Sequence, residues 1–519
     1  MIRAFWAPCV VVTVLLLAGS LLTPFNHDED QYYGAAHALS QGRLYLDFIY
    51  LQTPLQPLLG NALAKVAPGN SLWLLRFSQA FLGAAVFALV LRENLTVEGR
   101  SQTALLSALL MVSCYSFLFA STLYRNDMLP TLLATVGIIF LAREAQRIDG
   151  SGSEAGHWLG WITGGLFLGL SASAKANFLM LAVAPLLWLL LIKSPPARRR
   201  LRWSIAFAVG GIAGAAPTLV SFSLDPDKFV WQVVQFGAQA PLDWYPQVGL
   251  AYRLTVLGRV TDSLLVLLQG PAFAALAFVV LSRLFGSREA GRGGRPLLLD
   301  LFIAAGLIAA VLPNPAWRQY FVALLPALFL RLPAVLEAMP KRRRAAGSML
   351  LILSALVGLA AFAARLAKSA QDPDRLILSR WRESAWIGEE LQKAGEGGSI
   401  ASLSPHLVVD SGRFIHPRFT SGVFVYRWGG RERDAAIFRR GGVTPGSLAD
   451  AFARCPPIAI VTGYESGTGN AFRVDLEAPL RAYASAHAYR LRQSPFGKAR
   501  LYLNPNPGAC RETLPLAQQ

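Results

Sequence analysis

The loop that follows the first apolar stretch concentrates groups that can do acid–base chemistry. It covers residues 24–70, and near its start lie a histidine, three acidic residues and two tyrosines: His27, Asp28, Glu29, Asp30, Tyr32 and Tyr33. A carboxylate in such a loop can take a proton from an acceptor hydroxyl, as a general base does. The structural alternative is a helix capping box formed by Asp28 and Gln31. Because a cap explains Asp28 and leaves the neighbouring groups unexplained, the pattern favours an active site.

Further charged groups stand at the ends of later apolar stretches: Arg125, Asp127, Lys175 and Arg318, with Tyr320 two residues on. Ionisable groups at membrane depth are costly and usually face a functional cavity, although any one of them could be an anchor that reaches water. The topology inferred below puts all of them on the side of the first loop, so we expect a single site. The expected roles are catalysis by Asp28, Glu29 and Asp127, phosphate binding by Arg125, Lys175, Arg318 and Tyr320, and a substrate cavity lined by His27, Tyr32 and Tyr33.

The rest of the chain has the composition of a membrane protein. Of its 519 residues 54% are hydrophobic and only 15% are charged, whereas soluble domains carry about a quarter of charged residues. Apolar stretches long enough to cross a bilayer (~17–25 residues) predict about 11 spans, at residues 1–22, 71–91, 103–120, 128–143, 157–174, 176–192, 203–222, 262–282, 297–313, 316–337 and 346–366. The expected fold is mainly α: a polytopic helix bundle over residues 1–366.

Basic residues cluster between these spans, at 193–202, 283–295 and 341–344. The positive-inside rule places such loops, and with them the N-terminus, in the cytoplasm. The first loop and residues 367–519 then lie in the periplasm of a bacterial inner membrane, since the Arg- and Ala-rich composition suits a high-GC bacterium. The net charge of +18 is therefore a topology signal, and no nucleic-acid partner is expected.

Residues 367–519 have the pattern of a small soluble α/β domain. Helices are predicted near 375–395, 447–454 and 474–486, and strands at 399–403, 457–462, 489–493 and 499–503, the last two as a hairpin. Cys455 and Cys510 both fall in this domain, and disulfides persist in the periplasm. A Cys455–Cys510 bridge is our hypothesis.

Other classes of function fit less well. The sequence contains no P-loop and no Gly-rich dinucleotide fingerprint, so no nucleotide cofactor is expected. The main alternative is a membrane transporter or lipid-linked-sugar flippase, which predicts two related halves with broken spans and charges near the middle of the membrane. Here the charges gather at one edge and a large outer domain follows, which favours an enzyme.

The chain resembles the GT-C membrane glycosyltransferases, in the branch with the protein O-mannosyltransferases and the lipid A aminoarabinose transferase. Four loose motifs carry the resemblance: Asp28-Glu29-x-x-Tyr32, Arg125-x-Asp127, Gly169-Leu170 with Lys175, and Arg318 with Tyr320 and Pro326. The resemblance implies a polyprenyl-phosphate sugar as donor and the first-loop aspartate, here Asp28, as catalytic base. The acceptor would be a periplasmic glycolipid such as lipid A or its core, a polysaccharide or a protein, and the sugar stays open.

One departure from the family concerns a possible divalent metal. The aminoarabinose transferases carry an acidic residue before a Pro-Pro-Leu in the second half of the first loop, where this chain reads Tyr50-Leu51-Gln52-Thr53-Pro54-Leu55 without a carboxylate. A metal site therefore stays open, with His27, Asp28 and Asp47 as its candidate ligands.

Overall fold

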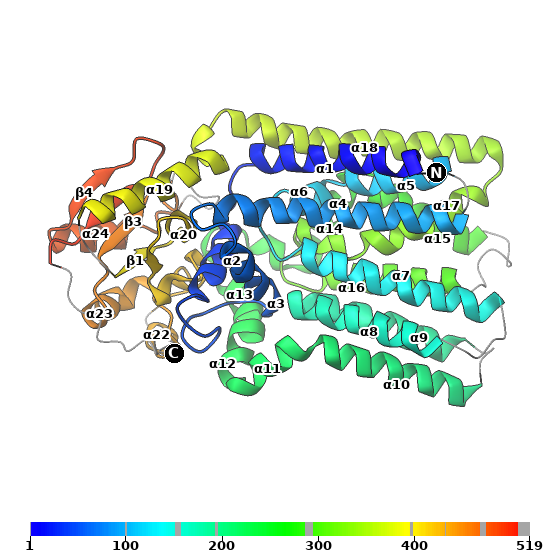
Figure 1. Ribbon diagram of the computed structural model, residues 1–519, viewed down its shortest axis with the longest axis horizontal. Helices are drawn as coiled ribbons and strands as arrows, with labels where there is room; N and C mark the ends of the chain where they lie inside the picture. Colours follow the sequence, from blue (N-terminus) through cyan, green and yellow to red (C-terminus); the bar gives the residue numbers. More distant parts are fainter. Residues whose placement is uncertain are drawn as a thin grey trace.

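The computed structural model describes residues 2–98, 101–150, 157–192, 196–285, 294–394, 398–430, 432–467 and 474–506. Its longest helices run side by side along the long axis of the molecule, and a smaller sheet-containing part covers one end of them (Figure 1). The larger helices of the bundle are α1 (Ile2–Leu22), α4 (Ser71–Glu98), α5 (Ser101–Ser113), α6 (Tyr115–Ser121), α7 (Met128–Gly150), α8 (His157–Ala174), α9 (Val183–Leu191), α10 (Ala197–Gly214), α11 (Ala216–Leu224), α14 (Val256–Leu268), α15 (Ala272–Phe285), α16 (Gly294–Val311), α17 (Leu325–Glu337) and α18 (Lys341–Ala370).

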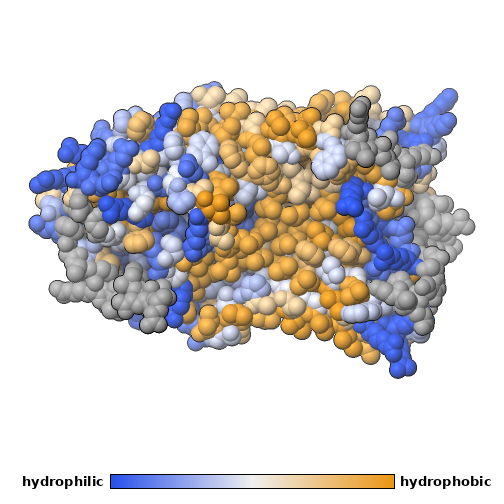
Figure 2. All heavy atoms as spheres, viewed as in Figure 1, coloured by the Kyte–Doolittle hydropathy of each residue, from blue (hydrophilic) through white to orange (hydrophobic). Residues whose placement is uncertain are grey.

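These helices form a membrane-spanning bundle. Five helices of the described chain are by themselves long and apolar enough to cross a bilayer, and up to eight spans result if each of three sharply bent helix pairs counts as one. A helix or a pair of helices lies at every apolar stretch that the sequence predicts. The count of about 11 spans stays a prediction. Figure 2 shows a broad hydrophobic band across the visible face of the bundle, with hydrophilic surfaces at both ends. The protein is therefore a multi-pass membrane protein.

Two of the bent pairs meet at their breaks. The α5–α6 pair bends by 69° and the α14–α15 pair by 98°, and the Tyr115 N–H donates to the Gln269 carbonyl at 2.9 Å across them. Gly270 has φ +141°, and a Cβ there would lie 2.8 Å from the Cα of Cys114. Glycine is thus required both by its backbone conformation and by the close approach. The contact fixes the start of α6, which carries Tyr115 and Phe119 toward the site.

The first loop forms two short helices, α2 (His27–Ala38) and α3 (Leu55–Ala64), which lie between the bundle and the sheet-containing part together with α12 (Pro226–Val230), the π-helix η2 (Trp231–Gln235) and α13 (Phe236–Gln247) (Figure 1). Three 3-10 helices complete this part of the chain: η1 (Ala176–Ala182), η3 (Ala251–Leu254) and η4 (Arg318–Ala323).

The C-terminal part is a mixed five-stranded sheet with helices around it, in the order β2-β1-β3-β5-β4. Its strands are β1 (Ser399–Ser402), β2 (Phe414–Ile415), β3 (Ala459–Thr462), β4 (Arg490–Gln493) and β5 (Arg500–Leu503), and its helices are η5 (Pro373–Arg375), α19 (Ile377–Lys393), α20 (His406–Val409), η6 (Pro417–Phe419), α21 (Val423–Tyr426), α22 (Asp434–Arg439), η7 (Pro445–Ser447), α23 (Leu448–Arg454) and α24 (Ala478–Ala486). β1 pairs in parallel with β2 and β3, and β5 pairs antiparallel with β3 and β4. The predicted α/β class and four of the strands are confirmed, and the two-residue β2 was not predicted.

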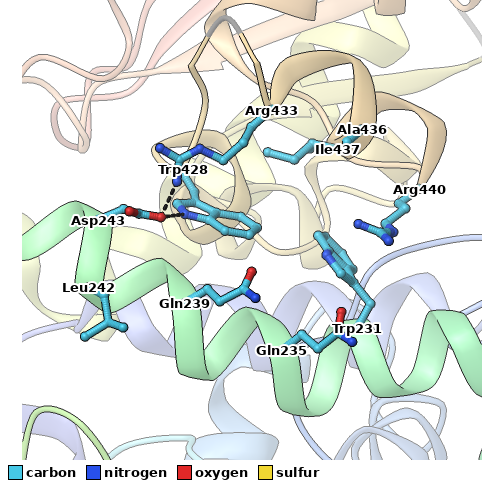
Figure 3. Close-up of a pocket in the computed structure, with 10 residues that line it drawn as sticks. All are labelled: Trp231, Gln235, Gln239, Leu242, Asp243, Trp428, Arg433, Ala436, Ile437 and Arg440. Carbon is cyan, nitrogen blue, oxygen red and sulfur yellow. Dashed lines mark hydrogen bonds and ion pairs between the residues drawn. The ribbon is translucent and has the colours of Figure 1, made fainter.

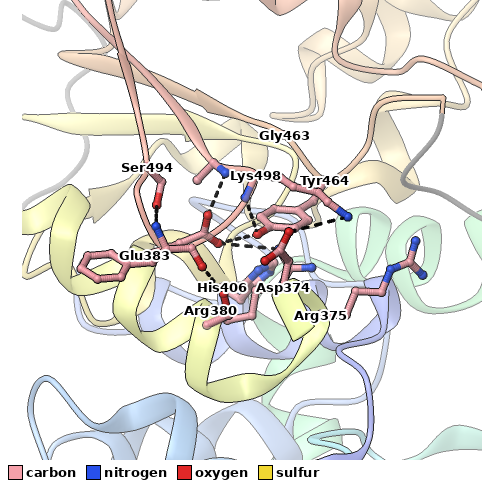
Figure 4. Close-up of polar contacts among 12 residues, drawn as sticks. Asp374, Arg375, Arg380, Glu383, His406, Gly463, Tyr464, Ser494 and Lys498 are labelled. Atoms are coloured by element: carbon pink, nitrogen blue, oxygen red, sulfur yellow. Dashed lines mark hydrogen bonds and ion pairs between the residues drawn. The ribbon is translucent and has the colours of Figure 1, made fainter. Parts of the chain in front are cut away.

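A buried carboxylate ties α19 to this sheet. Glu383 accepts a hydrogen bond from the Tyr464 hydroxyl at 2.6 Å and another from the Ala499 N–H at 2.8 Å, and the Arg380 guanidinium lies 3.0 Å from the centre of the Tyr464 ring (Figure 4).

Cys455 is disulfide-bonded. Its predicted partner, Cys510, lies outside the described residues.

The sheet-containing part is fastened to the first loop and the bundle by buried polar contacts. Asp410 accepts the N–H groups of Ser71 and Leu72 at 2.7 and 3.0 Å, so it caps the start of α4 from another part of the chain. Asp30 Oδ1 accepts the His406 N–H at 3.2 Å and lies 2.5 Å from His406 Nδ1. The first loop and the C-terminal part therefore share one end of the molecule.

Candidate active site at the start of α2

The first turn of α2 is capped by Asn26. The Asn26 side chain accepts the Asp28 N–H at 2.9 Å, while the Asn26 N–H donates to the Glu29 carboxylate at 3.0 Å, which completes a capping box. The structural alternative, a capping box of Asp28 with Gln31, does not hold, because Asn26 is the cap and Asp28 lies one residue inside the helix. Its carboxylate is thus left to other partners.

Asp28 begins a row of alternating charges. One of its oxygens lies 3.1 Å from His27 Nε2, and the other forms an ion pair with Arg125. The Nε of Arg125 donates to Asp127 at 2.9 Å, and the second oxygen of Asp127 pairs with Lys175. Asp28 is 22% exposed whereas Asp127 is 0% exposed. Asp28 is therefore the carboxylate of this row that a substrate can reach.

The surroundings of Asp28 keep it ionised. Burial alone would raise its pKa, but the charges of Arg125 and His27 hold the pKa well below its usual range. Burial opposes the charged form of His27, and the negative charge of Asp28 nevertheless raises the His27 pKa. An ionised carboxylate is the form that accepts a proton.

The other groups of this row are already paired. Lys175 lies over the Tyr320 ring, 4.8 Å from its centre, in addition to its ion pair. Tyr32 donates to the Asn126 side chain at 2.8 Å, and Asn126 in turn donates to Gln52 at 3.2 Å. Two cations and two carboxylates balance here, so Arg125 and Lys175 fix the position of the carboxylates.

Two arginines beside this row have no such acidic partner in the part of the chain that the structure describes. Arg318 donates to the Tyr115 hydroxyl at 2.8 Å, and Arg365 of α18 contacts the same tyrosine. Their guanidinium groups lie 5.3 and 5.0 Å from the centre of the Phe119 ring, and that of Arg125 lies 5.4 Å from it. Within the described ranges, neither Arg318 nor Arg365 has a carboxylate at ion-pair distance. Two adjacent positive charges without a counter-ion form a site for an anion.

The C-terminal part and α13 supply further groups around Asp28. Arg427 follows α21 and interacts electrostatically with Asp28, Tyr245 and Glu465. Glu465 is 5% exposed, and burial raises its pKa to about 8 despite the nearby His27. The site is therefore built from the first loop, the bundle and the C-terminal part together.

Three predicted site residues lie apart from this row. Glu29 is 0% exposed and pairs with Arg76 at 3.1 and 2.9 Å. Tyr33 is also 0% exposed, and its hydroxyl donates to the Leu72 carbonyl at 2.9 Å. Asp47 pairs with Arg43 at 3.2 Å and accepts its N–H at 2.7 Å.

This arrangement bears on the candidate metal. Among the residues that the structure describes, no three His, Cys, Asp or Glu side chains lie so that they could hold a metal ion. The oxygens of Asp28 face His27 and the Arg125 guanidinium, and Asp47 joins neither of them. The three candidate ligands do not fit a metal as a set, and no step is derived through one.

Sequence reasoning missed Arg365, Tyr115, Phe119, Arg427 and Glu465. Arg365 had a signal, because it is the first charged residue after Arg344 and stands near the C-terminal end of a long apolar helix. Arg427 and Glu465 come from short segments of the C-terminal part, whose position against the loop depends on tertiary packing.

Part of the chain matches a known protein family. Residues 30–210 match the sequence profile of the dolichyl-phosphate-mannose-protein mannosyltransferase family, a range that includes Arg125, Asp127 and Lys175. No curated protein sequence matches the chain.

Two solved structures share the fold over nearly the whole chain. ArnT from Cupriavidus metallidurans, bound to undecaprenyl phosphate, matches with a TM-score of 0.62 at 11% identity, over 96% of this chain and 97% of its own. The oligosaccharyltransferase AglB from Archaeoglobus fulgidus, in complex with an inhibitory peptide and a dolichol-phosphate, matches with a TM-score of 0.52 at 13% identity, over 96% of this chain and 74% of its own. The predicted resemblance is confirmed: residues 30–210 match the mannosyltransferase family model, and the chain shares the GT-C fold of ArnT and AglB over nearly its whole length.

Proposed function

We propose that this protein transfers a sugar from a polyprenyl-phosphate donor to an acceptor hydroxyl, with Asp28 as the general base. The proposal rests on one observation: the ionised, partly exposed Asp28 lies close to two arginines that have no carboxylate partner among the described side chains. The Asp28 partner Arg125 and these two arginines all contact the Phe119 ring. A base and an anion site side by side are what the displacement of a phosphate by a hydroxyl requires.

The arginine pair, Arg318 and Arg365, binds the donor phosphate in this proposal. As the bond between the sugar C1 and the phosphate oxygen breaks, negative charge grows on the phosphate, and two guanidinium groups stabilise it. The apolar surface of the bundle suits the polyprenyl chain. Undecaprenyl phosphate and dolichol-phosphate in the two similar structures support this choice of donor class.

Asp28 accepts the acceptor proton while the acceptor oxygen forms its bond to C1. The polyprenyl phosphate leaves from the opposite face, so the anomeric configuration inverts. Arg125 orients Asp28 and keeps it ionised, and Asp127 with Lys175 holds Arg125 in place. Glu29 has a structural role in this account, because its oxygens are occupied by Arg76 and by the N–H groups of Asn26 and Tyr124.

The acceptor is a periplasmic glycolipid such as lipid A or its core, a polysaccharide or a protein. We propose an inner-membrane location with the N-terminus in the cytoplasm and residues 367–519 in the periplasm, as the distribution of basic loops predicts.

A donor panel tests the proposal. Purified protein in lipid nanodiscs is incubated with undecaprenyl-phosphate hexoses, pentoses and uronic acids, together with an envelope glycolipid extract, and release of undecaprenyl phosphate is measured. Release from one donor class, without added nucleotide, is expected. No release from any donor, while a nucleotide sugar supports transfer, would overturn the proposal.

A further inference from the structure

A second pocket lies away from the row of charges, between α13 and the C-terminal part. It is a cleft of about 320 Å³, a volume in the range of small-ligand sites. Trp231, Gln235, Gln239 and Asp243 line it from η2 and α13, and Trp428, Arg433 and Arg440 line it from the opposite side (Figure 3). Nothing in the proposed transfer step uses these residues.

Two tryptophans line the cleft, Trp231 from η2 and Trp428 from the C-terminal part. The Trp231 and Trp428 rings lie 6.2 Å apart at an angle of 33°, and the Trp428 indole N–H donates to Asp243 at 2.9 Å. Both rings are more than nine-tenths buried, so their orientation is fixed before anything binds. Rigid aromatic surface with a polar group at its edge suits a ligand with apolar C–H faces and hydroxyl edges.

Polar side chains lie around these two rings. Gln235 and Gln239 lie four residues apart on consecutive helical turns, are exposed and line the cleft, and Gln239 points toward the tryptophans (Figure 3). An amide offers donors and an acceptor at once, which matches pairs of neighbouring hydroxyls. Asp243 also forms an ion pair with Arg433.

The remaining charge in the cleft is positive. Arg433 is neutralised by Asp243, whereas Arg440 lies 4.9 Å from the centre of the Trp231 ring. Within the described part of the chain, Arg440 has no carboxylate at ion-pair distance, and it is exposed. It can therefore bind a carboxylate or phosphate substituent of a ligand that rests on the tryptophans.

The cleft adjoins the candidate active site through two short segments. Asp243 lines the cleft, while Tyr245, two residues on, interacts electrostatically with Asp28. Trp428 likewise lines the cleft, and the preceding Arg427 interacts with Asp28. An extended ligand in the cleft would thus lie against the segments that wall the site of transfer.

From these contacts we infer that the cleft binds a sugar unit of the acceptor that carries an anionic group, and so holds a saccharide-containing acceptor for the transfer. The inference rests on the proposed function for its biological meaning, but the binding itself can be measured without catalysis. The anionic group is a uronic carboxylate or a phosphate, since either one matches Arg440.

Ligand-observed saturation-transfer NMR on the full-length protein in nanodiscs tests the inference. The probes are trigalacturonate, glucose 6-phosphate, neutral maltotriose and an aspartate tetrapeptide. Binding of trigalacturonate or glucose 6-phosphate, with maltotriose at least tenfold weaker, is expected, and which of the two binds identifies the anionic group. Arg440→Ala should weaken binding about 10-fold or more, and Gln239→Ala should weaken it less.

Arg439→Ala is the matched control, because Arg439 is an exposed neighbour on α22 that does not line the cleft. Equal losses in Arg439→Ala and Arg440→Ala, equal binding of the aspartate tetrapeptide, or no binding of either anionic saccharide would each overturn the inference. Asp28→Asn should bind like wild type, so failure of saccharide binding and failure of the proposed transfer are separate results.

Discussion

Asp28 and Glu29 are consecutive residues of α2, yet they lie in different regions of the molecule. Asp28 is 22% exposed and belongs to the row of charges beside the arginine pair, whereas Glu29 is 0% exposed and is held by Arg76 against the start of the bundle. Successive side chains of an α-helix are rotated by about 100° about its axis. The same helical turn therefore directs Asp28 toward the row of charges and Glu29 toward Arg76. Exposure and ion-pair partners, not position in the sequence, distinguish the proposed catalytic residue from the structural one.

The largest expected effect is that of Asp28→Asn on turnover. Loss of a general base typically costs about 10²–10⁴ in rate, while Asn26 still caps the helix and the side chain keeps its size. We therefore expect the rate of undecaprenyl-phosphate release per folded molecule to fall by that factor with little change in thermal midpoint. Asp450→Asn, at an exposed position on α23, is the control. A near-wild-type rate in Asp28→Asn would move the base elsewhere.

Glu29→Gln should have the opposite signature. Removing one partner of a fully buried ion pair costs about 3–5 kcal/mol, so the yield of folded protein and its thermal midpoint in detergent should drop, while the molecules that do fold retain activity. Glu389→Gln changes an exposed glutamate on α19 and should leave both unchanged. Loss of activity at unchanged stability would place Glu29 in the chemistry and erase the contrast between the two residues.

The substitutions Arg318→Gln and Arg365→Gln test whether the two arginines without an acidic partner in the described chain bind the donor phosphate. Hydrogen bonds to charged groups contribute about 1.5–3 kcal/mol, so each variant should raise the KM for the donor about 10–100-fold. Arg382→Gln, exposed on α19, serves as the comparison. An unchanged donor KM in both variants would show that the phosphate binds to other cations.

The buried Glu465 makes the stability of the protein depend on pH. The pKa of Glu465 is about 8 in the folded protein and about 4.3 in an unfolded chain, so folding favours its neutral form. This contribution is complete below pH 4 and is lost as the pH rises through 8. The thermal midpoint of wild type should therefore decline from pH 5 to 9, and Glu465→Gln should flatten the decline. Parallel curves for the two proteins would contradict the assigned pKa.

Much of this site could be predicted from the sequence because its signals are local. Charged residues at the ends of apolar stretches marked Arg125, Asp127, Lys175 and Arg318, and the structure places them around Asp28. The partners that separate Asp28 from Glu29 were not predictable, because Arg76 lies within an apolar helix 47 residues from Glu29.

Features that depend on contacts between distant parts of the chain could not be predicted from the sequence. The cap of α4 by Asp410 joins residues 339 and 338 positions apart, and a pattern search over short windows cannot detect it. The strand β2 has only two residues, too few for an alternating pattern. The sequence shows Arg365 as a charge at a helix end, but its position next to Arg318 depends on how α18 packs beside α6.

The most direct test of the role of Asp28 is the stereochemistry of a single turnover. Wild-type protein in excess over an undecaprenyl-phosphate sugar of known anomeric configuration is mixed with acceptor, and the product is examined by NMR and the protein by intact mass spectrometry. Base catalysis by Asp28 predicts an inverted anomeric configuration and no sugar bound to the protein. A retained configuration with a sugar adduct on Asp28 would show that this carboxylate is a nucleophile and would contradict the account.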